Sequence, residues 1–186
     1  MPLLRNGRTA GVVARLQALD DTVDAWFDRI RSPALDPVFY GLSSAADHGL
    51  LWLAIGSLRA AGKGDPQIAL RLGVSMGVES GLTNGPIKMC FRRVRPVHDA
   101  LPDEPLPYGM HRPITSSFPS GHAASAFTAA MLLSGSPLAP AYFVLAALVA
   151  SSRVYVKMHH ASDVLVGAAL GIALGAIARR VLPSSR

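Results

Sequence analysis

Apolar residues concentrate in five long segments of the chain, separated by short polar turns or by a proline-rich stretch. The segments cover residues 38–61, 66–87, 120–133, 138–156 and 162–182. Several contain only about 14–17 strongly apolar residues, near or below the roughly 17 that a membrane-spanning helix needs. Because only short turns join the last three segments, the pattern predicts an all-α, antiparallel helical bundle with about five membrane spans.

Residues 11–30 follow a different pattern. Apolar side chains recur there every three or four positions, and Asp20, Asp21, Asp24 and Asp28 stand between them. This periodicity predicts an amphipathic helix in the N-terminal region, residues 1–35. Such a helix either lies in the plane of a membrane interface or packs as an ordinary surface helix on the bundle, and the pattern fits both.

Glycine recurs at every fourth position in two of the apolar segments. The two stripes are Gly73, Gly77, Gly81 and Gly85, and Gly167, Gly171 and Gly175. Positions without side chains allow helix backbones to approach closely in lipid. The stripes therefore predict either a homodimer contact between glycine-striped helices or close packing inside one monomer.

Composition supports a membrane protein of one domain, residues 1–186. Half of the residues are apolar and only 16% are charged, against about 25% in typical soluble domains. The formal net charge is +6, but aromatic residues make up only 6% and the basic residues form no stripe interleaved with them. The charge is better explained by an anionic lipid surface and an anionic substrate than by nucleic acid.

Three short motifs between residues 88 and 163 combine cations with histidines. They read Lys88-x6-Arg95-Pro96, Pro119-Ser120-Gly121-His122 and Ser152-Arg153-x5-His159-x3-Asp163. In a five-span bundle all three lie on the same membrane face. Lys88 supplies a point charge for phosphate, Arg95 and Arg153 supply forked donors, and the backbone of Ser120, Gly121 and His122 begins a helix whose N–H groups attract anions.

His159 and Asp163 are four residues apart, which places them on one face of a helix that starts there. The carboxylate can then hold the Nδ1 proton of His159 and leave Nε2 with its lone pair. The histidines and carboxylates lack a zinc spacing such as His-Glu-x-x-His. The three cations supply the charge that a metal would otherwise bring, so neither a metal nor another cofactor is expected.

In order and residue type, the motifs resemble those of the PAP2 (phosphatidic acid phosphatase type 2) superfamily. The resemblance implies a metal-independent phosphatase in which His159 attacks phosphorus to form a phosphohistidine, His122 protonates the leaving oxygen, and Asp163 orients His159. It also implies phosphate binding by Lys88, Arg95, Ser120, Gly121 and Arg153. The apolar bundle selects the membrane lipid phosphatase branch.

Substrates implied by the family are polyprenyl phosphates or diphosphates, phosphatidylglycerol phosphate and phosphatidic acid. The compact length and the Ala/Arg/Gly-rich composition are similar to those of the small phosphatases of decaprenylphosphoryl-phosphoribose. Three alternatives stay open: a soluble acid phosphatase, a vanadate-dependent haloperoxidase, and a non-enzymatic membrane scaffold or transporter.

The expected location is the cell membrane, as an integral protein with its site at the bilayer interface. More Arg and Lys residues lie on the side of the site than on the opposite side, which favours the cytoplasmic face. Several of these cations bind substrate, however, and many family members act on the outer face.

Several polar residues outside these roles are weaker candidates. Asp47 and His48 lie inside an apolar segment, where they either hydrogen-bond another helix or border the substrate cleft; Glu79 has the same ambiguity. Arg92 and Arg93 are expected to contact lipid phosphates. His160 adjoins His159 but must point elsewhere, so it is expected either to support the site indirectly or to have no role in it. Two alternatives remain for four residues of the proline-rich loop: they either form a lid or recognise the substrate headgroup, or they are simply exposed to solvent. These residues are His98, Asp99, His111 and Arg112.

Overall fold

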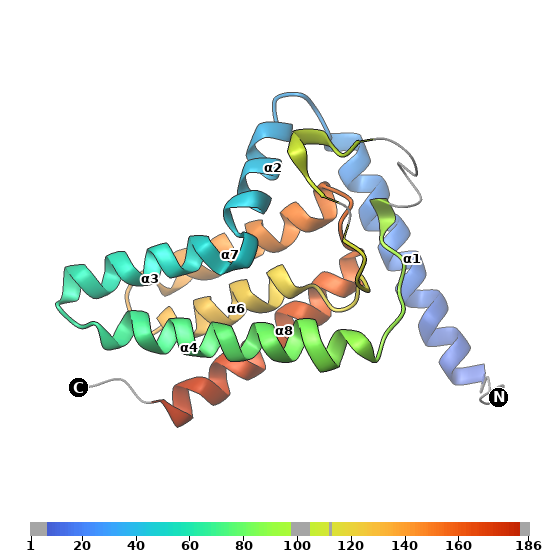
Figure 1. Ribbon diagram of the computed structural model, residues 1–186. Coiled ribbons are helices and arrows are strands. Elements are labelled where there is room, and N and C mark those ends of the chain that lie inside the picture. Colours follow the sequence, from blue (N-terminus) through green and yellow to red (C-terminus); the bar gives the residue numbers. More distant parts are fainter. Residues whose placement is uncertain (1–6, 98–104, 112, 183–186) are drawn as a thin grey trace.

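The computed structural model describes residues 7–97, 105–111 and 113–182, and no β-strand occurs in this part of the chain (Figure 1). The α-helices are α1 (Gly7–Ile30), α2 (Asp36–Ala45), α3 (Leu50–Lys63), α4 (Gln67–Leu82), α6 (Gly121–Leu133), α7 (Ala139–Tyr155) and α8 (Ala161–Val181). Short 3-10 turns form η1 (Asp47–Gly49) and η3 (Pro107–Gly109), and a π-helical turn, η2 (Thr83–Ile87), extends α4. The all-α prediction is confirmed.

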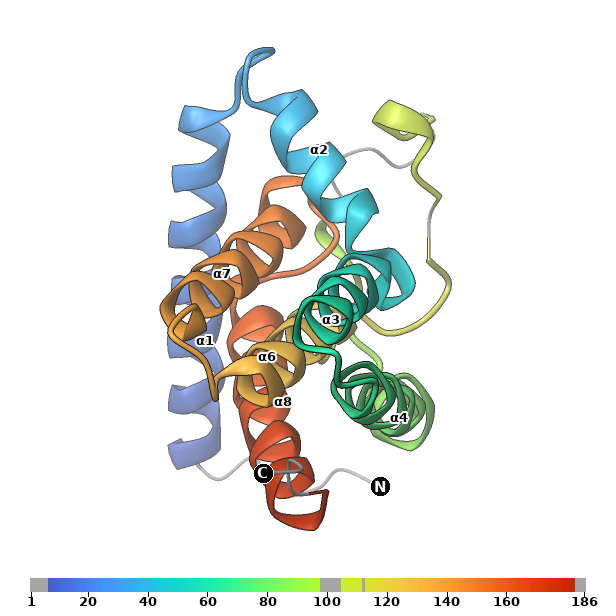
Figure 2. The ribbon, with the colours of Figure 1, turned by 90° about the vertical axis from the view of Figure 1, so that its left-hand side faces the viewer.

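Helix α6 is the centre of the bundle, with α3, α4, α7 and α8 around it (Figure 2). Its small side chains make this possible: Ala123, Ala124, Ala126, Ala129 and Ala130 have no exposed surface. Side chains of this size let neighbouring backbones approach closely on several sides at once.

The contact between α6 and α8 depends on the second glycine stripe. A Cβ atom on Gly167 would lie 2.4 Å from the carbonyl oxygen of Ser120, and one on Gly171 would lie 2.2 Å from that of Ala124. A Cβ atom on Gly175 would lie 2.6 Å from the Cβ of Met131. This stripe therefore packs inside the monomer, and the homodimer contact considered for it is wrong, because α6 already occupies that face of α8.

The first apolar segment, residues 38–61, is not one helix as expected. α2 ends at Ala45 and α3 begins at Leu50, and between them His48 and Gly49 have left-handed backbone angles, with φ of 53° and 74°. α2 therefore turns away from the direction of α3 (Figure 1). Hydropathy cannot detect this break, because the residues on both sides of it are apolar. The other four segments each correspond to one helix, namely α4 (with η2 continuing it), α6, α7 and α8.

Among the residues described, α8 alone is both long and apolar enough to cross a membrane. α6 and α7 are apolar but shorter; the 13 residues of α6 extend over only about 20 Å, against a hydrocarbon thickness of about 30 Å. Four helices nevertheless carry exposed apolar side chains: Leu58 on α3, Val78 on α4, Val144 on α7, and Leu165 and Ile177 on α8. The number of spans stays a prediction.

Helix α1 lies across one end of the bundle, roughly perpendicular to its long axis (Figure 1), where it contacts α7 and α8. Val12, Val13, Leu16 and Trp26 are exposed, whereas Asp20 is almost completely buried. The amphipathic helix is present as predicted, but part of its acidic side faces the protein and much of its apolar side faces outward.

The α6–α8 contact can be tested by adding side-chain atoms to α8. Gly171→Val should lower the stability of the detergent-solubilised protein by about 1–3 kcal/mol, because its Cβ would collide with backbone that cannot move without shifting α6. Gly62→Ala in α3, where a Cβ would meet nothing within 4 Å, should leave stability unchanged or slightly improved. Thermal unfolding in detergent measures both, and equal midpoints for the two variants would contradict the packing described.

Candidate active site

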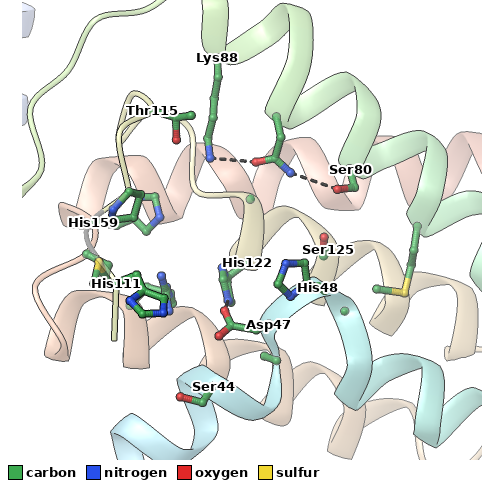
Figure 3. A pocket seen from close by; sticks show the side chains of 18 of the residues that line it. Ser44, Asp47, His48, Ser80, Lys88, His111, Thr115, His122, Ser125 and His159 are labelled. Atoms are coloured by element: carbon green, nitrogen blue, oxygen red, sulfur yellow. Dashed lines mark hydrogen bonds and ion pairs between the residues drawn. The ribbon is translucent and has the colours of Figure 1, made fainter. Parts of the chain in front are cut away.

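A cavity of about 930 Å³ opens at the end of the bundle near η1 (Figure 3). All three sequence motifs reach it, through Lys88, Arg95, Gly121, His122, Arg153 and His159. The other two predicted site residues, Ser120 and Asp163, are fully buried and do not line the cavity. The structure thus brings together residues from positions 88 to 163.

Lys88 follows η2 and extends toward the cavity. Its Nζ donates to Asn84 Oδ1 at 2.8 Å, and Asn84 Nδ2 donates to Ser80 Oγ at 3.1 Å (Figure 3). Burial, together with the positive charges of Arg95 and Arg153, lowers the pKa of Lys88 to about 8. Asn84 was not identified from sequence, although its position one helical turn before Lys88 is a usable signal.

Arg95 is held by neutral acceptors. Its five N–H groups are directed at Thr115 O and Oγ1, Ser116 O, Met158 O and His159 Nε2. Because arginine only donates, the 3.3 Å contact with His159 makes Nε2 the acceptor and places the imidazole proton on Nδ1. The N–H groups of Arg95 that were expected to bind a pair of phosphate oxygens therefore already have acceptors inside the protein. To bind Arg95, a phosphate must replace at least one of these acceptors.

Arg153 is buried at the last turn of α7. Its Nη1 donates to Ser43 Oγ of α2, while its Nε has no hydrogen-bond partner among the described residues. The carbonyl oxygen of Arg153 also accepts the backbone N–H groups of Met158 and His159, at 3.0 and 3.1 Å. The same residue therefore shapes the turn that carries His159, lines the cavity and keeps one buried donor that has no partner among the described residues.

His159 lies in the turn between α7 and α8, and only 2% of its side chain is exposed. Burial, with a further contribution from the nearby Arg153 and Arg95, lowers its pKa to about 3. The imidazole is thus neutral near pH 7, and its Nε2 keeps a lone pair.

Asp163 is adjacent to this imidazole but not hydrogen-bonded to it. Its Oδ2 lies 3.7 Å from His159 Nδ1, beyond hydrogen-bond length, and Nδ1 has no other partner among the described residues. Asp163 Oδ2 accepts the backbone N–H of His160 at 2.9 Å, and Oδ1 accepts from Arg93 at 2.6 Å. A shift of less than 1 Å would close the His159–Asp163 hydrogen bond.

The second motif starts α6, but its residues do different things. Ser120 Oγ caps the helix by accepting the N–H of Ala123, and the N–H of Ser120 donates to Asp163 O at 3.0 Å. Ser120 is therefore used inside the protein, which leaves the N–H groups of Gly121 and His122 for an anion. A Cβ on Gly121 would lie 2.8 Å from Asn84 Oδ1, so a larger residue here would push the Asn84 side chain away from its present position beside Lys88.

His122 is paired with a residue that the sequence left undecided. Its Nε2 lies 2.7 Å from Asp47 Oδ1 in η1, and both residues line the cavity. This hydrogen bond lowers the pKa of Asp47. Asp47 thus both bonds another helix and borders the cleft, the two alternatives considered from sequence; His48 lines the cavity as well.

Arg93 contradicts its expected role at lipid phosphates. Its guanidinium forms ion pairs with Asp20 and Asp163 instead. Among the weaker candidates, Glu79 is buried and accepts from Thr83 and Ser125, His160 caps α8, and His111 lines the cavity. His98, Asp99 and Arg112 lie outside the described residues.

The sequence model of the PAP2 superfamily matches residues 68–186. The chain belongs to the PAP2 superfamily. The resemblance inferred from the motifs is confirmed, and the match covers every residue of the three motifs. Within residues 7–97, 105–111 and 113–182, no three His, Cys, Asp or Glu side chains group as metal ligands would.

This PAP2 protein is similar to curated and solved relatives. It is 41% identical over 91 residues to a decaprenylphosphoryl-5-phosphoribose phosphatase of Mycobacterium tuberculosis, a match that covers 49% of each chain. The corresponding phosphatase of Mycolicibacterium smegmatis is 33% identical over 129 residues, covering 68% of this chain and 67% of the relative. The chain thus spans about half the length of the M. tuberculosis relative in the first match and about two thirds of the second.

Two solved structures share the fold. The transmembrane PAP2-type phosphatidylglycerolphosphate phosphatase of Bacillus subtilis superimposes with a TM-score of 0.70 at 27% identity, covering 90% of this chain and 86% of that one. Aquifex aeolicus LpxE gives a TM-score of 0.67 at 29% identity, covering 86% of this chain and 93% of that one.

The cation cluster predicts pH-dependent anion binding. Tungstate, a dianion throughout the neutral and alkaline range, should bind the cavity less tightly as the pH rises through about 8, because the ammonium of Lys88 is then lost. In Lys88→Arg the decrease should move to much higher pH, since a guanidinium stays protonated. Calorimetric titration across this pH range tests both, and identical pH profiles for wild type and variant would show that Lys88 does not control binding.

Proposed function

We propose that this PAP2 protein is a metal-independent phosphatase that removes phosphate from a membrane lipid phosphate through a phosphohistidine intermediate. The observation that carries the proposal is one cavity holding Lys88, Arg95 and Arg153 beside the neutral imidazole of His159. Relatives named as phosphatases of lipid phosphates support it. The roles below are assigned on that basis.

The first step transfers the phosphoryl group to the protein. Lys88, Arg153 and the N–H groups at the start of α6 bind the phosphate oxygens, and Arg95 turns an N–H from His159 to the substrate. The freed Nε2 lone pair attacks phosphorus, an N–P bond forms, and the P–O bond to the lipid breaks. Asp163 stabilises the proton on Nδ1 as the ring becomes cationic.

His122 handles the leaving group. Because Asp47 accepts from its Nε2, Nδ1 is the nitrogen left for the departing oxygen, and His122 gives it the Nδ1 proton from its doubly protonated, imidazolium form. Water then attacks phosphorus, His122 takes its proton, and the N–P bond breaks to release inorganic phosphate and restore His159. Asp47 keeps the ring of His122 in one orientation through both steps.

The first glycine stripe lines the same cavity and supports a lipid substrate. Gly73, Gly77, Gly81 and Gly85 of α4 and η2 form one wall, opposite Leu53 of α3. A Cβ on Gly77, Gly81 or Gly85 would meet nothing within 4 Å, so these three positions face open space, whereas a Cβ on Gly73 would lie 3.8 Å from Leu53 of α3. We infer that the lipid chain lies along these glycines while its phosphate reaches His159.

A membrane setting follows from the outward surface. The exposed apolar side chains on α3, α4, α7 and α8 would face hydrocarbon, and α1, across the end of the bundle, would lie in the interface at the level of the site. The charge distribution favours the cytoplasmic face. A polyprenyl-linked phosphate is the favoured substrate, in line with the names of the curated relatives, and a glycerolipid phosphate is the second candidate.

Loss of either histidine should stop turnover. His159→Ala removes the nucleophile and His122→Ala the proton donor, so each should reduce phosphate release by more than about 100-fold; Asp163→Asn should have a smaller effect. The assay follows phosphate released from decaprenyl phosphate and from phosphatidylglycerol phosphate in detergent with excess EDTA. Near-normal release by either alanine variant, or loss of wild-type release on chelation, would contradict the mechanism.

The same preparation separates the alternative functions. A soluble-type acid phosphatase would hydrolyse para-nitrophenyl phosphate with kcat/KM equal to that for the lipids. A haloperoxidase would oxidise bromide when supplied with vanadate and peroxide. A scaffold or transporter would release no phosphate from any substrate.

Filling the glycine-lined wall should affect long lipids selectively. Gly77→Leu should reduce kcat/KM for decaprenyl phosphate by about tenfold or more, about 1.4 kcal/mol of binding, and should affect a short-chain phosphate ester much less. Gly62→Leu makes the same substitution on α3 away from the cavity and should behave as wild type. Equal losses on long and short substrates would argue against a chain site along α4.

A further inference from the structure

Asp20 of the N-terminal helix forms part of a buried network behind the site. Only 3% of its surface is exposed, although it lies in a helix whose neighbouring positions are open to solvent. Its Oδ1 accepts the backbone N–H of Ser162 at 2.7 Å, and its Oδ2 accepts the Ser162 hydroxyl at 2.8 Å. α1 thereby binds the first turn of α8, one residue before Asp163.

The same carboxylate reaches Asp163 through Arg93. Arg93 Nη2 pairs with Asp20 Oδ2, while Nη1 donates to Asp163 Oδ1 at 2.6 Å and to Ser162 Oγ at 2.7 Å. Asp163 is fully buried, and its other oxygen lies 3.7 Å from His159 Nδ1. Asp20, Arg93 and Asp163 thus form a chain of charges that ends at the imidazole.

Charge balance shows what Asp20 adds. Arg93 bound to Asp163 alone would neutralise the carboxylate that has to stabilise a cationic His159. With Asp20 on its other side, Arg93 is shared between two carboxylates, and the network of three keeps a net charge of −1. The forked guanidinium fixes the position of Asp163, while Asp20 preserves negative charge toward His159.

We propose that Asp20 and Arg93 are positioning residues for the phosphoryl-transfer step, acting on His159 through Asp163. Neither lines the cavity, so neither would contact the bound phosphate, and we expect its binding to be unchanged when they are replaced. The proposal rests on the proposed function, since it assumes that His159 is the nucleophile. It gives the N-terminal helix a role in catalysis beyond packing or membrane contact.

The test compares Asp20→Asn with Asp21→Asn, the same change at the next, exposed position of α1. Asp20→Asn should lower kcat on a lipid phosphate by about 10- to 100-fold, the scale of a misplaced reacting group, with KM unchanged. Asp21→Asn should behave as wild type. Activities are expressed per tungstate-binding site, which counts folded protein with an intact cation cluster.

A second variant covers the case in which Asp20→Asn does not fold. Arg93→Lys keeps the charge but cannot contact two carboxylates at once, so it should also lower kcat at constant KM. Combining the two substitutions should add little to the larger single effect, because both break one network. Asp20→Glu should recover part of the activity.

Each outcome bears on one idea. An inactive wild type would refute the proposed function itself. An active wild type in which Asp20→Asn or Arg93→Lys keeps its kcat per binding site, with only a lower thermal midpoint, would show that the network is structural and would overturn this inference alone.

Discussion

The structure is organised around three buried cations that no carboxylate neutralises. Among the described residues, no Asp or Glu oxygen lies within ion-pair distance of Lys88, Arg95 or Arg153. Their partners are neutral: an amide for Lys88, carbonyls and a hydroxyl for Arg95, and a hydroxyl for Arg153. Such a cluster is costly to bury, and it leaves positive charge available to a dianionic ligand.

The surrounding elements serve to hold these cations and the histidines in place. The α7–α8 turn supplies one carbonyl group to Arg95, and the loop at residues 115–116 supplies two others. The close contact of α6 with α8, made possible by glycine, brings the starts of both helices together, so that the N–H of Ser120 reaches Asp163 O. The cavity therefore depends on helix packing that occurs away from it.

The carboxylates have a separate distribution. Asp47 lies against His122, and Asp163 lies beside His159 with Arg93 and Asp20 behind it. Negative charge is thus placed beside the two histidines rather than beside Lys88, Arg95 and Arg153. This separation keeps the side of the cavity that holds the three cations positive and gives each imidazole its own neighbouring carboxylate.

Much of the fold and site could be predicted from local sequence patterns. Apolar segments located α4, α6, α7 and α8, and a period of three to four residues located α1, because helix periodicity is a local property. The motif residues Lys88, Arg95, Gly121, His122, Arg153 and His159 do line one cavity. Their spacing within each motif depends on helix starts and turns, which are also local.

The break at His48 and Gly49 could not be predicted, because apolar residues continue on both sides of a left-handed turn. The sequence left the role of Asp47 undecided and assigned Arg93 to lipid phosphates, and it gave no site role to Asn84 or Asp20. These residues act through contacts that a local sequence pattern does not show. The sequence by itself determined α1, α4, α6, α7 and α8, the cations and the histidines. Only the tertiary structure decided that Asp47 faces His122, and which glycine stripe packs against a helix and which lines a cavity, since those choices depend on how helices rotate against one another.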